Sequence, residues 1–561
     1  MDRHTRRAIE DYRRHEAGPI ENNLVDELLA GDLDRQELLR RGAMFGLSAG
    51  LLGTLLAYAG EAPAATLAPA TRSVTRGGTL RVAVTKPGAA IEPSKIDTVG
   101  AVGVVSIPGE YLTYASPSGK LQPWLATSWK PNRDATVWTF QIRRGVRFHD
   151  GKTLTADDVV STFKVLTGKD SAAASVFKGI LSPGGVRKTG PYTVQFRLQQ
   201  ATGGFPYLVS QSTYQGPILP RSYRVGTYVR SKMPGTGPYK LQSYVEGRSA
   251  VFVRNEAYWG GSPPLDEVRL TFYESSAPQV LALRAGQVDL VQQLSAQEVL
   301  PFAGSSRYQV WTAKTANHRQ LGMRTDQESF RDPRVRRAVA LTLDRPDLVQ
   351  RLWRGRAIIG NDSPFTPLYP STSRGVAQRR KSLQQARQLL AAAGQSSLSF
   401  TLTTWQNLEI PDYAQIVQSS ARQAGIDVKL EILSGGEYYG APPNTDYATN
   451  TPWLNRTATI TDYGHRAIPN VYLTAAFATG GEWNASKYSN PRFDAALKSY
   501  IAASDLASQR RHARTMQTIL LADTPVIIAY FYDWIAAGSP KVRGYRTEGL
   551  GAIGLRGVSL A

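Results

Sequence analysis

The chain has 561 residues, of which 42% are hydrophobic and 20% are charged. This length is too great for one hydrophobic core and predicts roughly two to four domains. The absence of cysteine excludes disulfides, zinc–thiolate and iron–sulfur sites, and a lipid anchor on cysteine. The net charge is +21, but the basic residues are scattered and no zinc-finger, RRM or basic-region pattern accompanies them, so no nucleic-acid partner is expected.

Residues 34–65 have the features of an export signal. Arg40 and Arg41 form a pair in a segment similar to the twin-arginine motif. An uncharged stretch rich in glycine and alanine follows, and it ends in small residues that suit a signal peptidase. The stretch is also long enough to span a bilayer, so a retained anchor and a buried helix are the alternatives to a cleaved leader. Residues 1–33 form a polar extension.

Residues 137–164 predict a strand, a turn and a helix. Polar and apolar residues alternate from Val137 to Ile142, which is the pattern of a half-buried strand. Thr155 is a good N-cap, and Asp157 and Asp158 lie in the first turn of the following helix, where carboxylates favour the helix dipole.

The second half of the chain predicts alternating helices and strands. Helices at Lys381–Ala393 and Ile410–Gln423 flank a strand at Leu398–Thr404, and a second strand follows at Val428–Leu433. The stretch Val335–Leu348 has helical spacing. This alternation is typical of layered α/β domains.

Several segments imitate catalytic motifs. Gly46–Gly50 satisfies G-x-S-x-G but lies inside the apolar export stretch, and Gly145–Thr153 is one residue too long for a phosphate-binding loop. Ser161 and Lys164 match S-x-x-K, and Lys188–Gly190 matches K-T-G, but the S-D-N element between them is missing. The six histidines show no metal-binding grouping, so no catalytic residue, metal or cofactor is expected. An exported serine hydrolase using Ser161 and Lys164 is the alternative of another class.

Six segments, in order along the chain, carry a family resemblance. They are L-Q-P-W-L-A-T-S-W at 121–129, V-W-T-F-Q-I-R-R-G-V-R-F-H-D-G-K-T-L-T-A-D-D-V at 137–159, G-T-G-P-Y at 235–239, R-N-E-A-Y-W-G-G at 254–261, A-L-R-A-G-Q-V-D at 282–289 and D-P-R-V-R-R-A-V-A at 332–340. The chain resembles the peptide- and nickel-binding family (family 5) of solute-binding proteins of bacterial ABC importers. Locally, the motifs indicate turns and packing more than ligand contacts.

The resemblance implies an α/β, two-lobed periplasmic-binding-protein fold of the class II type, with an additional domain inserted in the first lobe. The chain would divide into lobe I at 76–113, 234–318 and 525–561, the inserted domain at 114–233, and lobe II at 319–524. Ligand is expected between the lobes, which close by hinge motion.

The resemblance also implies ligand anchors. In peptide-binding members an aspartate in an A-D-Y segment takes the ligand ammonium, and an arginine six residues earlier takes its carboxylate. Asp462, followed by Tyr463, and Arg456 match these positions. A surface ion pair between them is the alternative. The aromatic candidates for the cleft walls are Trp405, Tyr438, Tyr439, Trp453, Tyr530 and Tyr532.

The predicted function is therefore capture without catalysis. We expect an extracytoplasmic monomer, not a lipoprotein, that delivers peptides or another small molecule to ABC permease subunits and their ATPase. An opine, a glycoside or a metal chelate is the alternative ligand within the same family.

Overall fold

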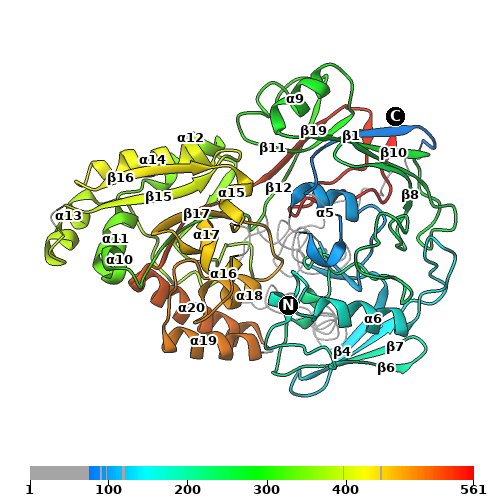
Figure 1. Ribbon diagram of the computed structural model, residues 1–561, viewed down its shortest axis with the longest axis horizontal. Helices are drawn as coiled ribbons and strands as arrows, with labels where there is room; N and C mark the ends of the chain where they lie inside the picture. Colours follow the sequence, from blue (N-terminus) through cyan, green and yellow to red (C-terminus); the bar gives the residue numbers. More distant parts are fainter. Residues whose placement is uncertain are drawn as a thin grey trace, which may run out of the picture.

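The computed structural model describes residues 75–561 except 89–90, 97, 117–119, 396, 443–444 and 504. Within these residues the strands form three large sheets of seven, six and four strands and two two-stranded ribbons. Figure 1 shows the six-stranded sheet and its helices on one side of the molecule and the other two sheets on the opposite side. The predicted extension at 1–33 and the predicted export signal at 34–65 lie outside the described residues. In the part of the chain that is described, no helix is both long and apolar enough to cross a bilayer.

The seven-stranded sheet forms the core of the first lobe. Its central strand, β1, is parallel to both of its neighbours, and the pairings farther out are antiparallel. In spatial order the strands are β12 (Gln309–Ala313), β19 (Trp534–Gly538), β11 (Leu290–Leu294), β1 (Thr79–Thr85), β10 (Glu267–Tyr273), β9 (Ser249–Arg254) and β8 (Tyr239–Val245). The shorter elements of this lobe are η1 (Pro93–Lys95), α5 (Val99–Val105), α9 (Ser276–Arg284), β20 (Val542–Arg543) and β21 (Ser559–Leu560).

The four-stranded sheet belongs to a separate domain with its own buried core. It consists of β4 (Ala126–Pro131), β5 (Val137–Ile142), β7 (Thr193–Arg197) and β6 (Val186–Gly190), and it packs against α6 (Ala156–Leu166). The predicted strand and helix are confirmed as β5 and α6. Thr155 is the N-cap of α6, and its backbone N–H and hydroxyl both donate hydrogen bonds to the carboxylate of Asp158. The remaining elements are β2 (Thr113–Ala115), β3 (Leu121–Pro123), α7 (Ala174–Phe177) and α8 (Phe205–Leu208).

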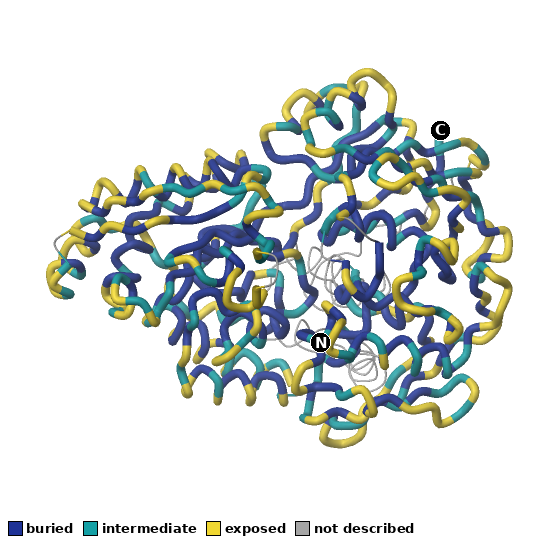
Figure 2. The backbone as a smooth tube through the Cα atoms, viewed as in Figure 1, coloured by how far each residue is buried: buried dark blue, intermediate teal, exposed yellow. Residues whose placement is uncertain are grey.

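The six-stranded sheet forms the second lobe. In spatial order its strands are β14 (Ala357–Ile359), β18 (Val526–Tyr532), β13 (His318–Met323), β17 (Ala458–Tyr463), β15 (Ser399–Trp405) and β16 (Asp427–Leu433). The predicted strands at 398–404 and 428–433 correspond to β15 and β16, which are parallel. Figure 2 shows the buried strands of this lobe between exposed outer helix faces.

The helices of the second lobe include both predicted ones, which appear as α13 and α14. The helical stretch predicted at 335–348 is instead two helices, because Asp344 caps the second one and Pro346 lies in its first turn. The helices are α10 (Glu328–Arg331), α11 (Pro333–Leu341), α12 (Arg345–Trp353), α13 (Leu383–Ala392), α14 (Ile410–Arg422), α15 (Gly435–Tyr439), α16 (Tyr447–Asn450), α17 (Pro452–Asn455), α18 (Asn470–Tyr472), η2 (Leu473–Phe477), α19 (Pro491–Ala502) and α20 (Leu506–Asp523).

Two adjacent chain segments cross between the lobes. One joins β12 to β13, and the other joins β18 to β19 through Asp533. They are held side by side, because the Thr315 hydroxyl donates to the Tyr532 carbonyl at 2.6 Å and the Tyr532 N–H donates to the Asn317 carbonyl at 3.0 Å. The predicted boundary at residue 525 placed 526–532 in lobe I. These residues form β18, which pairs with β13 and β14, so this crossing falls at Asp533 instead.

A buried carboxylate joins several of the motifs that carry the family resemblance. Glu110 is 1% exposed and accepts hydrogen bonds from the indole N–H groups of Trp124 and Trp259 and the hydroxyls of Thr236 and Tyr258, at 2.7–2.8 Å. Burial raises the pKa of Glu110, while these donors act in the opposite direction. One side chain thus ties together the segments that flank β8 and β9 of the first lobe and the start of the four-stranded domain.

The two glycines of the G-T-G-P-Y segment are explained by close packing in the same place. A Cβ on Gly235 would lie 1.9 Å from the Pro108 carbonyl oxygen, and one on Gly237 would lie 2.6 Å from that of Ile107. The backbone can approach this closely only without side chains. The interpretation of the motif as a packing element is confirmed.

The Glu110→Ala variant should lose about 3 kcal/mol or more of unfolding free energy, because buried donors are left without an acceptor. Urea denaturation of the purified protein measures this change. Glu274→Ala is the matched control: its exposed carboxylate pairs with Lys86, and its loss should change stability by less than about 0.5 kcal/mol. Equal effects of the two substitutions would show that the Glu110 cluster contributes little.

A second prediction concerns pH. His318 in β13 is fully buried between the rings of Tyr463, Tyr472 and Phe531, and burial lowers its pKa to about 4. The unfolded chain takes up this proton near pH 6.5 and the folded chain only near pH 4, so the free energy of unfolding should fall as the pH drops through that interval. The contribution is on the order of 3 kcal/mol. Urea denaturation at a series of pH values measures this dependence. In His318→Asn the fall in unfolding free energy between pH 6.5 and 4 should be smaller by this amount. An equal fall in both proteins would contradict the lowered pKa of His318.

Candidate functional site

The predicted anchor Asp462 lies near the end of β17, in the middle of the six-stranded sheet. β17 is antiparallel to β13 and parallel to β15, and Asp462 faces Arg319 across the β13 pairing. The Asp462 side chain keeps 22% of its surface exposed, although its strand neighbours Thr461 and Tyr463 are buried. The sheet therefore presents one carboxylate to solvent at the end of the strand that leads toward the first lobe.

A fully buried arginine positions this carboxylate. The Arg319 guanidinium donates to both oxygens of Glu409 at 2.8 and 3.0 Å, and it also donates to Asp462 and to the hydroxyl of Tyr532. Burial acts to lower the pKa of Arg319, but Asp462 and Glu409 outweigh it, and the pKa lies well above its ordinary value. Arg319 is therefore a permanent cation.

The cluster has one more negative than positive group. Arg319 contributes one positive charge, and Glu409 and Asp462 contribute two carboxylates. Glu409 is almost fully buried and grips the guanidinium with both oxygens, so the excess negative charge is reachable only at Asp462. This arrangement can accept a cationic group from a solute.

Tyr530 and Tyr532 support the carboxylates from β18. The Tyr530 hydroxyl donates to Glu409 at 3.0 Å, and the Tyr532 hydroxyl donates to Asp462 at 3.0 Å. Both rings are buried, and burial raises the pKa of each phenol well above 10. Both were predicted as cleft residues, but they are buried and contribute to the site by orienting the two carboxylates.

The other four aromatic candidates lie near β15, which is the neighbour of β17 on the side away from β13. Trp405 stacks on Tyr438 and meets Tyr439 edge-on at 5.2 Å, and Tyr439 contacts Trp453 at 5.9 Å. Trp405 and Tyr439 remain partly exposed, whereas Tyr438 and Trp453 are buried. Only the first two can touch a solute.

Tyr463 has a structural position. Its ring lies parallel to His318 at 5.4 Å, and its hydroxyl donates to the Trp483 carbonyl at 3.1 Å. It is buried, so it packs under the site.

The structure separates Arg456 from this group. Arg456 stands six residues before Asp462, but β17 begins only at Ala458, and the Arg456 N–H ends the short helix α17 by donating to the Pro452 carbonyl. Its half-exposed side chain pairs with Glu431 at 3.3 Å and lines a cavity of about 550 Å³ with α15, α16 and α17. Arg456 and Asp462 do not form the ion pair considered as an alternative for them.

Arg319 and Glu409 were absent from the sequence-based predictions. The only local signal was a polar run, His318-Arg319-Gln320, inside a strand that the structure buries completely. Arg319 lies 143 residues from Asp462 and 90 from Glu409 in sequence. Only the folded sheet brings the three together.

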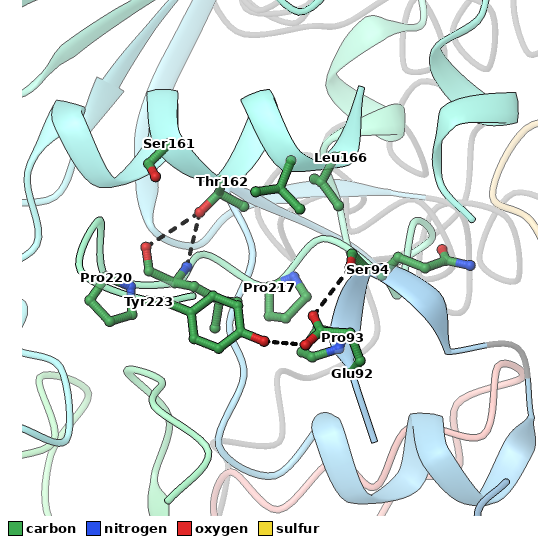
Figure 3. Close-up of a pocket in the computed structure, with 12 residues that line it drawn as sticks. Glu92, Pro93, Ser94, Ser161, Thr162, Leu166, Pro217, Pro220 and Tyr223 are labelled. Carbon is green, nitrogen blue, oxygen red and sulfur yellow. Dashed lines mark hydrogen bonds between the residues drawn. The ribbon is translucent and has the colours of Figure 1, made fainter. Parts of the chain in front are cut away.

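The rival serine site has no room for a substrate. Ser161 lies on α6 beside a small cavity of about 20 Å³, which is space for about one water molecule. Figure 3 shows this cavity, where Tyr223 and Ser94 donate hydrogen bonds to Glu92 and no base faces Ser161 among the residues drawn. Lys164 is exposed on the helix, and Lys188 of the K-T-G segment pairs with Asp157 at 2.9 Å. The geometry favours binding over acyl transfer.

Comparison with known proteins agrees with the resemblance seen in the motifs. The family model for the bacterial extracellular solute-binding proteins, family 5, matches residues 120–463. The oligopeptide-binding protein AppA of Bacillus subtilis is 26% identical over 466 residues, which cover 78% of this chain and 83% of that protein.

Solved structures share the fold. The structure of AppA in complex with a nonapeptide superposes with a TM-score of 0.73 at 23% identity, covering 87% of this chain and all of that one. NikZ from Campylobacter jejuni, in complex with Ni(L-His), gives a TM-score of 0.72 at 21% identity, covering 85% of this chain and 97% of that one. The two-lobed α/β prediction is confirmed, and the chain belongs to the bacterial extracellular solute-binding proteins of family 5.

Proposed function

We propose that this chain is the extracytoplasmic solute-binding component of an ABC importer and that it captures short peptides between its lobes. The observation that carries the proposal is the excess negative charge of the Arg319–Glu409–Asp462 cluster, which is reachable only at Asp462. A peptide ammonium supplies the missing positive charge. The naming of AppA as an oligopeptide-binding protein supports the same ligand class.

Asp462 is suited to hold an ammonium because it is already oriented. Arg319 and Tyr532 both bond to the same oxygen, Oδ1, which leaves the second oxygen for a ligand. A charge-assisted hydrogen bond in a partly desolvated site is roughly twice as strong as a neutral one. The exposed edges of Trp405 and Tyr439 would contact the apolar part of the ligand.

Arg456 is proposed as an anchor for the far end of a longer ligand. The cavity beside it is large enough for one or more side chains, and the guanidinium can grip a carboxylate with two hydrogen bonds. The two anchors lie on different elements, so a ligand that binds both would extend from Asp462 in β17 to the cavity beside α17.

Delivery completes the proposal. Residues 34–65 would export the chain by a twin-arginine-like signal, cleaved or retained as an anchor, and the binding protein would act as a monomer that passes its ligand to permease subunits driven by an ATPase. Binding without chemistry agrees with the membership in a family of solute-binding proteins.

The Asp462→Asn variant should bind free-amine tripeptides more weakly than wild type by about 2–5 kcal/mol, because the ligand ammonium loses its charged partner. Isothermal titration calorimetry with trialanine measures the difference. The amide keeps the site's shape, and Arg319 retains Glu409, so folding should persist.

Two controls sharpen this test. N-acetyl-trialanine has no ammonium and should bind wild type weakly and be unaffected by the substitution. Asp326→Asn removes a carboxylate that pairs with Arg324 and should leave peptide affinity unchanged. If acetylated and free peptides bind wild type equally, Asp462 is not the ammonium anchor.

Native mass spectrometry of the protein purified from its own host should release a heterogeneous set of short peptides on denaturation. The reason is that main-chain and terminal groups, common to all peptides, would carry the recognition. Recovery of a single opine, glycoside or metal chelate would keep the importer role and remove the peptide assignment.

A further inference from the structure

The loop that follows β17 contains a buried arginine without a counter-charge. Arg466 is 7% exposed, and no carboxylate lies within 4.0 Å of its guanidinium among the residues that the structure describes. Its Nη1 donates only to the carbonyls of its own loop, His465 at 2.9 Å and Gly464 at 3.5 Å. Its Nε is buried with no hydrogen-bond partner.

Other buried arginines of this lobe have a carboxylate partner or more backbone acceptors: Arg336 donates to the carbonyls of Asp523, Phe330 and Arg331. Arg345 donates to both oxygens of Asp362 at 2.8 Å, and Arg319 has Glu409 and Asp462. Leaving a buried charge unpaired is among the more expensive arrangements in a folded protein. Arg466 therefore keeps donor capacity that the described residues leave unused, and an anion from solution can supply the missing acceptor.

The loop lies where a ligand between the lobes would lie. The guanidinium of Arg466 sits 5.2 Å from the ring of Tyr214, which rests on the core of the first lobe. Ile468 packs against the core of the four-stranded domain. Gly464, between Asp462 and Arg466, is exposed, so a small solute can reach the loop.

A neighbouring histidine adds a neutral donor. The Nδ1 of His465 accepts a hydrogen bond from the Ala316 N–H at 2.9 Å, so in the neutral ring the proton is on Nε2. Burial and the nearby Arg466 lower the pKa of His465 to about 4, so the ring is neutral at physiological pH. In this state Nε2–H can donate to an oxygen and cannot bind a metal ion.

We propose that Arg466 and His465 form an anion subsite beside Asp462, which recognises a carboxylate close to the ammonium of the ligand. This inference rests on the proposed function, because Asp462 is taken to hold the ammonium. It narrows the ligand class to peptides with an acidic side chain at the amino-terminal residue. Arg456, on the other side of Asp462 in sequence, remains the anchor for the far carboxylate.

The first arm of the test does not depend on peptide binding. Acetate, the smallest carboxylate, should raise the Tm of the full-length protein more than chloride at equal ionic strength, because ligand binding to the folded state stabilises it. The difference should disappear in Arg466→Gln and persist in Arg466→Lys. It should also persist in the control Arg324→Gln, whose arginine is already paired with Asp326 at 2.7 Å.

The second arm compares glutamyl-alanyl-alanine with glutaminyl-alanyl-alanine by calorimetry. Wild type should prefer the first by about tenfold or more, as expected for a charge-assisted pair, and Arg466→Gln should lose this preference. The wild-type comparison needs no variant, so it remains decisive if the substituted protein does not fold.

The outcomes separate the two proposals. If both tripeptides bind wild type equally and acetate has no effect that requires Arg466, the anion subsite is wrong while peptide capture stands. If neither tripeptide binds but the acetate effect requires Arg466, peptide capture is wrong while the anion subsite stands.

Discussion

The second lobe is organised around the burial of one guanidinium. Arg319 has no exposed surface, so every one of its polar contacts must come from the protein. Those contacts come from Glu409 at the start of α14, Asp462 in β17 and Tyr532 in β18. Removing one partner of such a group typically costs about 3–5 kcal/mol, so the relative positions of these elements are tightly constrained. The orientation of Asp462 toward solvent is a consequence of that constraint.

The same cluster lies next to both segments that cross between the lobes. Arg319 is the second residue of β13, which begins just after one crossing, and Tyr532 is the last residue of β18, which ends just before the other. A solute cation that binds Asp462 therefore changes the charge balance of a network attached to both hinge segments. Under the proposed function, the ligand anchor and the segments that join the lobes would therefore share residues.

Buried polar groups also specify how the first lobe meets the four-stranded domain. Glu110 accepts from four donors on three segments, and the glycines at 235 and 237 allow the backbone to approach Pro108 and Ile107. Apolar packing alone is tolerant of small shifts, whereas a buried carboxylate is satisfied in few arrangements. The motifs at 121–129, 235–239 and 254–261 supply these donors and close contacts.

Local patterns predicted local structure well. Alternation gave β5, capping residues gave α6, and helical spacing gave α13 and α14 to within two residues at most. Failures arose where the determinant is non-local. β18 reads V-I-I-A-Y-F-Y and is buried on both faces, so nothing in its pattern says which sheet it joins. Arg456 was placed by its spacing from Asp462, but it caps the end of α17, and the strand begins only at Ala458. The partners of Asp462, Tyr532 and Arg319, lie 70 and 143 residues away, beyond any motif window.

Local charge, and not the net charge of +21, sets the ligand class in our proposals. Asp462 carries negative charge that its own partners leave uncompensated, and Arg466, four residues later, carries an uncompensated positive charge. A solute with only an ammonium or only a carboxylate would neutralise one of these charges and leave the other without a counter-charge. A solute that carries both neutralises the pair while losing its translational and rotational freedom once. The long-range positive field acts at another stage, because it governs encounter with acidic solutes and surfaces more than the strength of the final contact.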